Sequence, residues 1–124
     1  MVRPGPSAPT AAQVKEEKQA RRSKSSRKQI KFTVFFTNRT SKNINLIWKD
    51  YEGNEVIIQR DMVAGQTHRE PTYLTHPYIA RDSATNKLMP FFHESTSSVV
   101  FEGLNFHVQH DGVIEVDISE EISL

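Results

Sequence analysis

The sequence predicts an all-β fold: an antiparallel β-sandwich of about seven to eight short strands, preceded by a disordered basic N-terminal arm. Two observations lead to this prediction. From residue 30 onwards, apolar and polar residues alternate over short runs that turn residues separate, and no segment there keeps a helical period. Before residue 30, charged and small residues dominate, and Val14 is the only large aliphatic residue between Pro4 and Ile30.

Residues 1–29 form the predicted arm. A segment with so few apolar side chains cannot bury enough surface to offset the conformational entropy lost on folding, so we expect it to lack stable structure. The spacing of Glu and Lys within residues 11–22 favours a transient helix there. Residues 30–120 form the predicted sandwich domain.

The strands are predicted from their period of two. Apolar residues at 30, 32, 34 and 36 predict a strand over 30–36. The pattern recurs at 44–48, at 56–58 after a turn at 51–54, and at 114–118. Shorter candidate strands lie at 66–70, 77–81, 87–92, 98–101 and 104–109.

The formal net charge of +1 combines two regions of opposite sign. Residues 1–32 hold nine basic and two acidic residues, a net charge of +7, whereas residues 33–124 hold seven basic and thirteen acidic residues, a net charge of −6. The basic run 21–28 suits nuclear localisation, contact with nucleic acid or an acidic partner, or a plain solubility tail. Ser23 and Ser25 lie within it, among basic residues where basophilic kinases act.

Several classes of function find no support in the sequence. The chain has no cysteine, no glycine-rich phosphate loop and no nucleophile elbow, so we expect neither an enzyme nor a cofactor. His107 and His110 would face opposite sides of a predicted strand, so we expect no metal site. No apolar run reaches the length of a signal-peptide core or a membrane span. These features favour an intracellular protein, cytoplasmic or nuclear, without a membrane partner.

Two blocks of sequence resemble the β domain of the von Hippel–Lindau (VHL) protein family. In the first, the family's Asn-Arg-Ser/Thr turn, its tryptophan ten residues later and its glycine five residues after that fall on Asn38, Trp48 and Gly53. In the second, the family's segment Ser-Tyr-x-x-His-x-Trp-x-x-Arg-Asp falls on Thr72 to Asp82. The resemblance is good over residues 33–90 and weak from there to 118, and it implies the same β-sandwich.

In that family, the β domain binds an extended peptide that carries hydroxyproline, from the α subunit of hypoxia-inducible factor. A buried polar pair discriminates such a ligand from proline, because the pair is left unsatisfied when the hydroxyl is missing. By position, the resemblance implies six peptide-binding residues: Trp48 as the pocket floor, Thr72 and His76 as partners of the hydroxyl, Tyr78 as an aromatic wall, and Asn38 and Tyr73 near the peptide path.

The sequence also departs from the family pattern. The family's pocket tyrosine falls on Ile58 or a neighbour, and Pro71 replaces a histidine and so removes a backbone donor. The family's ubiquitin-ligase function depends on a helical domain that follows the β domain and docks on elongin. Because no amphipathic helix follows the last predicted strand before Leu124, we expect no elongin-binding domain in this chain.

The leading hypothesis is a non-catalytic module that binds a hydroxyproline-containing peptide in a ubiquitin pathway of the hypoxia response, either with ligase components in trans or as a competitor that shields the target. It requires Thr72 and His76 to converge beside Trp48. The alternative is a structural or scaffold sandwich with a lost pocket, whose basic arm contacts nucleic acid or an acidic partner. Core burial alone would then explain Trp48 and Tyr78, and the pair at 81–82 is interpreted as a structural charge pair that ends a strand.

Overall fold

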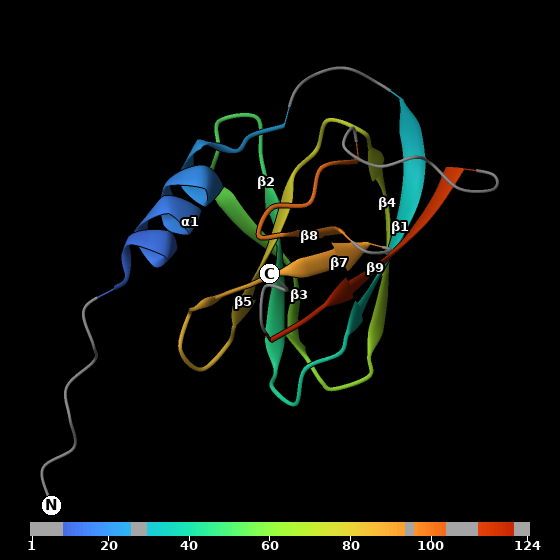
Figure 1. Ribbon diagram of the computed structural model, residues 1–124. Helices are drawn as coiled ribbons and strands as arrows, with labels where there is room; N and C mark the ends of the chain where they lie inside the picture. The colour runs from blue at the N-terminus through green and yellow to red at the C-terminus, as the bar shows by residue number, and fades with distance from the viewer. Residues whose placement is uncertain (1–8, 26–29, 94–95, 104–111, 121–124) are drawn as a thin grey trace, which may run out of the picture.

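The computed structural model describes residues 9–25, 30–93, 96–103 and 112–120, which form one helix and a sandwich of two β-sheets (Figure 1). The first sheet has the strand order β4-β1-β9-β7-β8 and the second has the order β3-β2-β5-β6. The predicted all-β sandwich is therefore confirmed. The elements are α1 (Ala11–Arg22), β1 (Lys31–Asn38), β2 (Ile44–Lys49), β3 (Glu55–Met62), β4 (Thr67–Tyr73), β5 (Tyr78–Asp82), β6 (Leu88–Met89), β7 (Phe91–His93), β8 (Thr96–Ser98) and β9 (Val113–Ile118).

The core between the sheets is built around β1. Its buried residues alternate with more exposed ones, as the period of two predicts. The ring of Phe36 lies at the centre, with its centroid 5.3 Å from that of Tyr78 and 5.5 Å from those of Phe91 and Phe101. These tilted and edge-to-face contacts fix the two sheets against each other.

Two features of the sheets differ from the expected simple antiparallel order. Strand β9 lies between β1 and β7 in the first sheet, and it pairs with β1 in parallel and with β7 in antiparallel. The strand predicted over 87–92 is divided at Pro90 into β6, in the second sheet, and β7, in the first. Proline has no backbone N–H for a ladder, which suits a point where the chain crosses between sheets. The strand predicted over 104–109 lies outside the described residues.

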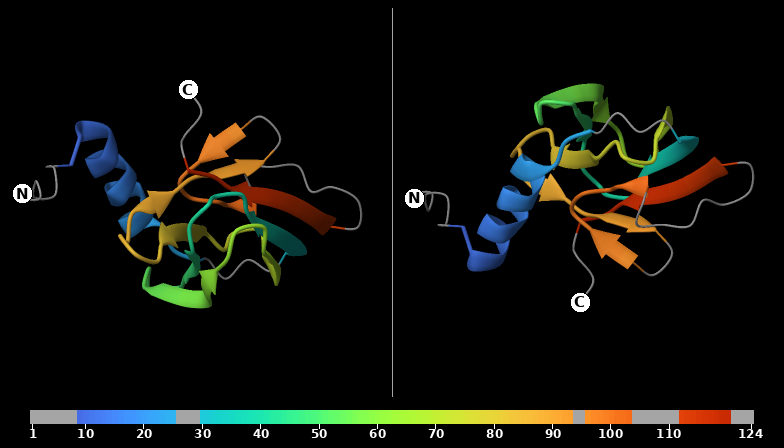
Figure 2. Two further views of the ribbon diagram at one scale, coloured as in Figure 1. Left: turned by 90° about the horizontal axis from the view of Figure 1, so that it is seen from below. Right: turned by 90° about the horizontal axis from the view of Figure 1, so that it is seen from above.

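Helix α1 lies within the predicted arm, at the residues where the sequence favours a transient helix. It packs on the outer face of the second sheet (Figure 2). There Ala20 is fully buried, in a cluster with Ile47 and Ile79. Strand β5 is consequently buried on both faces. A count of large apolar residues does not detect this contact, because the helix buries a small side chain and adds charged contacts. Predicted arm residues 1–8 and 26–29 lie outside the described residues.

The charged contacts converge on Arg81 at the outer face of β5. Its guanidinium donates to both carboxylate oxygens of Glu17 on α1, at 2.8 and 3.2 Å, and to both of Glu55 on β3, at 2.8 and 3.2 Å. A fifth bond reaches the carbonyl of Asn86, so all five N–H donors are used. Arg81 thus has the structural role that was predicted, but its partners are these carboxylates, and Asp82 pairs with Lys42 instead.

Within the described residues, no helix is long and apolar enough to cross a membrane. In the same part of the chain, no three His, Cys, Asp or Glu side chains form a group that could hold a metal ion.

Candidate functional site: an aromatic cluster beside a strand edge

Four aromatic side chains meet at one end of the sandwich. Trp48 comes from the end of β2, Tyr51 from the β2–β3 turn, Tyr73 from the end of β4, and His76 from the β4–β5 loop. We call these four residues the aromatic cluster. His76 lies at its centre, with its ring centroid 5.5 Å from Trp48, 5.5 Å from Tyr51 and 5.0 Å from Tyr73.

The geometry of the aromatic cluster leaves part of it open. The rings of Trp48 and His76 are inclined by only 31°, whereas Tyr51 meets both of them edge-on, at 88° and 87°. His76 is 6% exposed, Trp48 and Tyr73 are half-buried, and Tyr51 is 39% exposed. The cluster therefore presents aromatic surface to solvent around a buried imidazole, an arrangement that suits contact with an apolar ring.

Backbone hydrogen bonds hold the strands and loops that carry this cluster. The N–H of Lys49 donates to the carbonyl of Pro77, which joins the end of β2 to the β4–β5 loop. The N–H of His76 donates to the carbonyl of Tyr73 and closes a turn. The position of His76 against Trp48 is thus set by main-chain geometry.

The predicted hydroxyl partner Thr72 has a partner inside the protein. The phenol of Tyr78 donates to its Oγ1 at 2.6 Å and also lies 3.2 Å from Oε2 of Glu70. Glu70 Oε1 is in turn 3.0 Å from Nε2 of His68. Burial raises the pKa of the Tyr78 phenol, so this group stays protonated and acts as the donor.

The predicted residues therefore fall into two groups. One group is joined by pairwise contacts: His76 contacts Trp48 and Tyr73, Tyr78 pairs with Trp48 across β5 and β2, and Tyr78 bonds to Thr72. Within it, Tyr78 is only 1% exposed and belongs to the core, so it supports the site from beneath.

Asn38 is the predicted residue that the structure places elsewhere. It lies at the far end of β1 from the residues that pair with Thr72 and Tyr73. Its fully buried amide donates to the carbonyls of Lys42 and Met62 and accepts from Thr40. The Asn-Arg-Thr sequence therefore organises a turn, and this structural role is sufficient to explain the residue type.

Ile58, the position predicted for the family's pocket tyrosine, is half-buried and packs against the core between the sheets. It brings no hydroxyl to the site. Tyr51, which the sequence reasoning did not select, supplies a phenol at the aromatic cluster from a different element.

Strand β4 is an edge of the first sheet, so one side of its backbone is unpaired within that sheet. Leu74 N–H donates to the carbonyl of Ile30, and in this antiparallel register the odd-numbered residues of β4 direct their backbone groups outward. Pro71 is one of these residues. The outer edge therefore lacks one N–H donor beside Thr72, as the sequence predicted.

Segment 23–25, between α1 and β1, contacts the aromatic cluster. The indole Nε1 of Trp48 donates to Ser25 Oγ at 2.7 Å, and Ser25 Oγ donates to the carbonyl of Lys49 at 2.7 Å. Sequence reasoning missed this contact because Ser25 lies 23 residues before Trp48 and 24 residues before Lys49. Lys24 and Ser25 line a shallow groove together with Trp48, Asp50, Tyr51 and Glu52.

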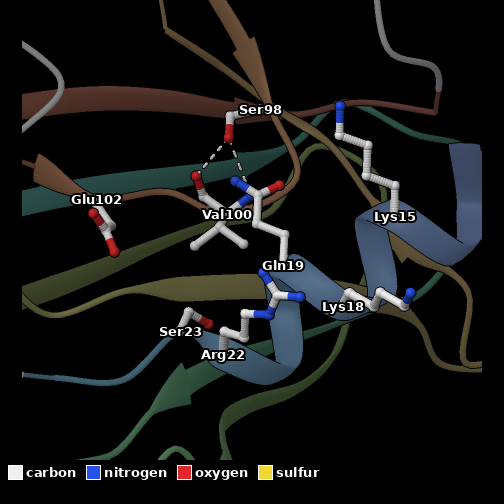
Figure 3. A pocket seen from close by; sticks show the side chains of 8 residues that line it. All are labelled: Lys15, Lys18, Gln19, Arg22, Ser23, Ser98, Val100 and Glu102. Atoms are coloured by element: carbon white, nitrogen blue, oxygen red, sulfur yellow. Dashed lines mark hydrogen bonds between the residues drawn. The ribbon is translucent and has the colours of Figure 1, made fainter.

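A second groove lies between α1 and residues 98–102, and its cations all come from one face of the helix. Figure 3 shows the α1 side chains on one side, with Ser98, Val100 and Glu102 opposite them. Glu102 is the one acidic residue among the described residues that line it. We call it the basic groove; its residues are Lys15, Lys18, Gln19, Arg22, Ser23, Ser98, Val100 and Glu102.

A two-sheet sandwich with an open aromatic cluster beside an unpaired strand edge belongs to the class of small recognition domains. The family model of the VHL β domain matches residues 21–94, more than half of the chain. The protein therefore belongs to the VHL β domain family, which consists of non-catalytic substrate-recognition modules. The match begins within α1 and includes segment 23–25. No curated protein matches the sequence.

Proposed function

We propose that this domain binds an extended peptide that contains hydroxyproline, as in the α subunit of hypoxia-inducible factor. The observation that carries the proposal is the position of His76 against Trp48. Thr72 bonds to Tyr78, the residue that pairs with Trp48 in the second sheet. An apolar wall and two polar groups are the minimum needed to hold a pyrrolidine ring and to read its hydroxyl.

The proline ring is proposed to lie against the exposed part of the aromatic cluster. Tyr51, Tyr73 and Trp48 all contact the ring of His76. Flat aromatic faces contribute large contact areas at a low cost in side-chain entropy. This arrangement replaces the family's pocket tyrosine with one from the β2–β3 turn.

Thr72 is proposed to donate a hydrogen bond to the ligand hydroxyl. Its Oγ1 accepts a hydrogen from Tyr78, so its own hydrogen is directed to another acceptor. Thr72 is 6% exposed, so a ligand that reaches this donor would meet it in a largely dehydrated position. A donor in a site from which water is excluded discriminates strongly against a ligand that cannot accept.

The rest of the peptide is proposed to add a strand along β4. Outward backbone groups at positions 67 and 69 and the N–H of Tyr73 supply the pairing, and the exposed proline at 71 interrupts it. The carbonyl of Tyr73 accepts from His76 and takes no part.

Paired peptides that differ only in proline hydroxylation test this proposal. We expect the full-length chain to bind the hydroxyproline peptide about tenfold more tightly, which corresponds to about 1.4 kcal/mol. His76→Ala should remove the preference. His93→Ala is the matched control, because His93 is similarly buried, at 5% exposure, but lies on β7. Equal affinity of the unmodified chain for both peptides would contradict hydroxyl recognition.

We further propose that this binding serves a ubiquitin pathway. The chain acts there either as a recognition component assembled with a ligase in trans or as a competitor that shields the hydroxylated target. Adding the chain to a reconstituted ubiquitylation reaction separates the two. A recognition component should raise the ubiquitylation of the target, and a shielding competitor should lower it. An unchanged level of ubiquitylation would contradict both roles.

The basic groove supports a second candidate function, the docking of an acidic segment. Lys15, Lys18 and Arg22 lie on one exposed face of α1 above a domain that is otherwise acidic. Binding of an oligoglutamate peptide that falls in Lys15→Gln/Lys18→Gln, but not in Arg60→Gln/Lys87→Gln, would support this function. Stronger, salt-dependent binding of single-stranded DNA would instead favour nucleic acid.

A further inference from the structure

Ser25 lies at the junction between α1 and the proposed peptide site. Its N–H donates to the carbonyl of Asp50 at 2.9 Å, while its hydroxyl donates to Lys49 and accepts from the indole of Trp48. Ser25 is 5% exposed. A single hydroxyl therefore fixes the side chain of Trp48 and attaches segment 23–25 to the end of β2.

The β2–β3 turn and two acidic side chains surround the segment that carries Ser25. The preceding residues pack on the β2–β3 turn, where a Cβ at Gly53 would lie 3.5 Å from the carbonyl of Ser23. Asp50 and Glu52 line the same groove as Ser25. Backbone N–H groups of the turn, that of Asn54 first, hold the pKa of the Asp50 carboxyl below its ordinary value, so it is anionic at neutral pH.

The residues before Ser25 match the substrate pattern of basophilic kinases. Arg22 and Arg21 precede it by three and four positions, and both are exposed on the last turn of α1. Ser23 also lies in this run. Its hydroxyl donates to the carbonyl of Ala20 and makes no contact with Trp48 among the bonds described for it.

We propose that Ser25 is a phosphorylation site and that its phosphate separates segment 23–25 from Trp48, which weakens peptide binding. In the modification, Ser25 Oγ forms a bond to the γ-phosphorus of ATP as the bond from that phosphorus to the β–γ bridging oxygen breaks. ADP leaves, and the hydroxyl proton passes to the kinase's base. Phosphoserine carries close to two negative charges, which the carboxylates of Asp50 and Glu52 repel.

The kinase reaches Ser25 when segment 23–25 opens, and the docking of α1 opposes this opening. The bonds between Glu17 and Arg81 hold the helix that precedes the segment. Weakening them should therefore raise the rate of phosphorylation without changing the target serine. Glu17→Gln provides this variant, because Glu17 lies outside the aromatic cluster.

The test uses the full-length chain, ATP and a kinase that requires arginine three residues before serine. Trp48 is the only tryptophan in the chain, so its emission reports directly on this contact. We expect phosphate on Ser25, faster modification of Glu17→Gln, a red shift of the emission, and about five- to tenfold weaker binding of the hydroxyproline peptide. Ser23→Ala should leave all of these results unchanged.

Two substitutions separate the effect of charge from the loss of hydrogen bonds. Ser25→Asp should reproduce the red shift, and Ser25→Ala, which removes both hydroxyl bonds without adding charge, should give a smaller one. Modification of Ser23 alone, or Ser25 phosphate with unchanged Trp48 emission, would overturn the proposal.

Only the last step of this inference rests on the proposed peptide function. If the unmodified chain shows no preference for hydroxyproline, the proposed function fails while the phosphate position and the Trp48 emission still decide the rest. If the unmodified chain binds the peptide and the phosphorylated chain binds it equally well, the regulatory step fails and the proposed function stands.

Discussion

The phenol of Tyr78 donates a hydrogen bond to Thr72 at 2.6 Å, so the hydroxyl expected to meet the ligand is already held by a side chain from the opposite sheet. Tyrosine stands here where the family has tryptophan, and the exchange adds a hydroxyl beneath the site. The bond gives Thr72 a fixed orientation before any ligand arrives.

Tyr78→Phe should remove this orientation and keep the ring packing on Phe36. We expect a loss of about 1 kcal/mol in the free energy of unfolding, measured by urea denaturation, because the bond is buried. The preference for hydroxyproline over proline should also decrease. A variant with lower stability but an unchanged preference would show that Tyr78 has no part in orienting Thr72.

Pro71→Ala should restore a backbone N–H at the outer edge of β4. Because the register directs this position away from β1, the sheet keeps its bonds and stability should change by less than about 0.5 kcal/mol. Peptide affinity should rise by about threefold if the ligand pairs with this edge. Arg69→Pro, which removes the next outward N–H, should lower the affinity, and equal affinities in both variants would contradict strand addition.

Acid should release α1 from the sheet. The hydrogen bonds from Arg81 hold the pKa of Glu17 below its ordinary value of 4.5. A depressed carboxyl pKa contributes stability that is present above the unfolded-state value and is lost as the pH falls through the folded-state value. The wild-type chain should therefore be more stable than Glu17→Gln at pH 7, and the difference should vanish in strong acid.

Thermal unfolding followed by circular dichroism between pH 7 and pH 3 measures this difference. Glu16→Gln is the control, because it changes the adjacent glutamate, whereas the ion pair with Arg81 is made by Glu17. A difference between wild type and Glu17→Gln that stays constant across this range would show that the ion pair does not hold the helix.

Gly103→Ala should destabilise the domain by about 1 to 3 kcal/mol through overpacking. A Cβ at this position would lie 2.5 Å from Cζ of Phe32 and 2.9 Å from Cδ2 of Leu74. Gly65→Ala offers a comparison without crowding, because nothing lies within 4 Å and only its φ of +82° opposes a side chain. We expect that variant to cost about 1 kcal/mol. Similar urea midpoints for both variants would contradict close packing at Gly103.

Many of the strands were predictable because the alternation that marks each of them lies within a few neighbouring residues. Alternation at β1, β2 and β9 follows from one buried face, and the structure confirms these strands within a residue or two of the predicted bounds. The partners of each strand were not predictable. The parallel pairing of β9 with β1 depends on which edge is free once the other strands have formed.

The residues of the candidate site also divide into those that a local motif identifies and those that only tertiary contacts bring together. Thr72, Tyr73 and His76 follow one another closely in the chain, so a sequence motif was able to select them together. Tyr51 joins them only through the β2–β3 turn, and Ser25 only through a contact across 23 residues. Neither residue has a local pattern that marks it, since an aromatic residue in a turn and a serine in a basic run are both common.

The sequence by itself thus determined the class of fold, the family and the region of the site, because hydrophobic alternation and a spaced polar motif are properties of the chain alone. Tertiary structure decided that Asn38 organises a turn, that Tyr78 supports Thr72 from the core, and that α1 packs on the sheet. These outcomes depend on distances between residues far apart in sequence. The bond between Glu17 and Arg81 spans 64 residues, and composition carries no record of such a pair.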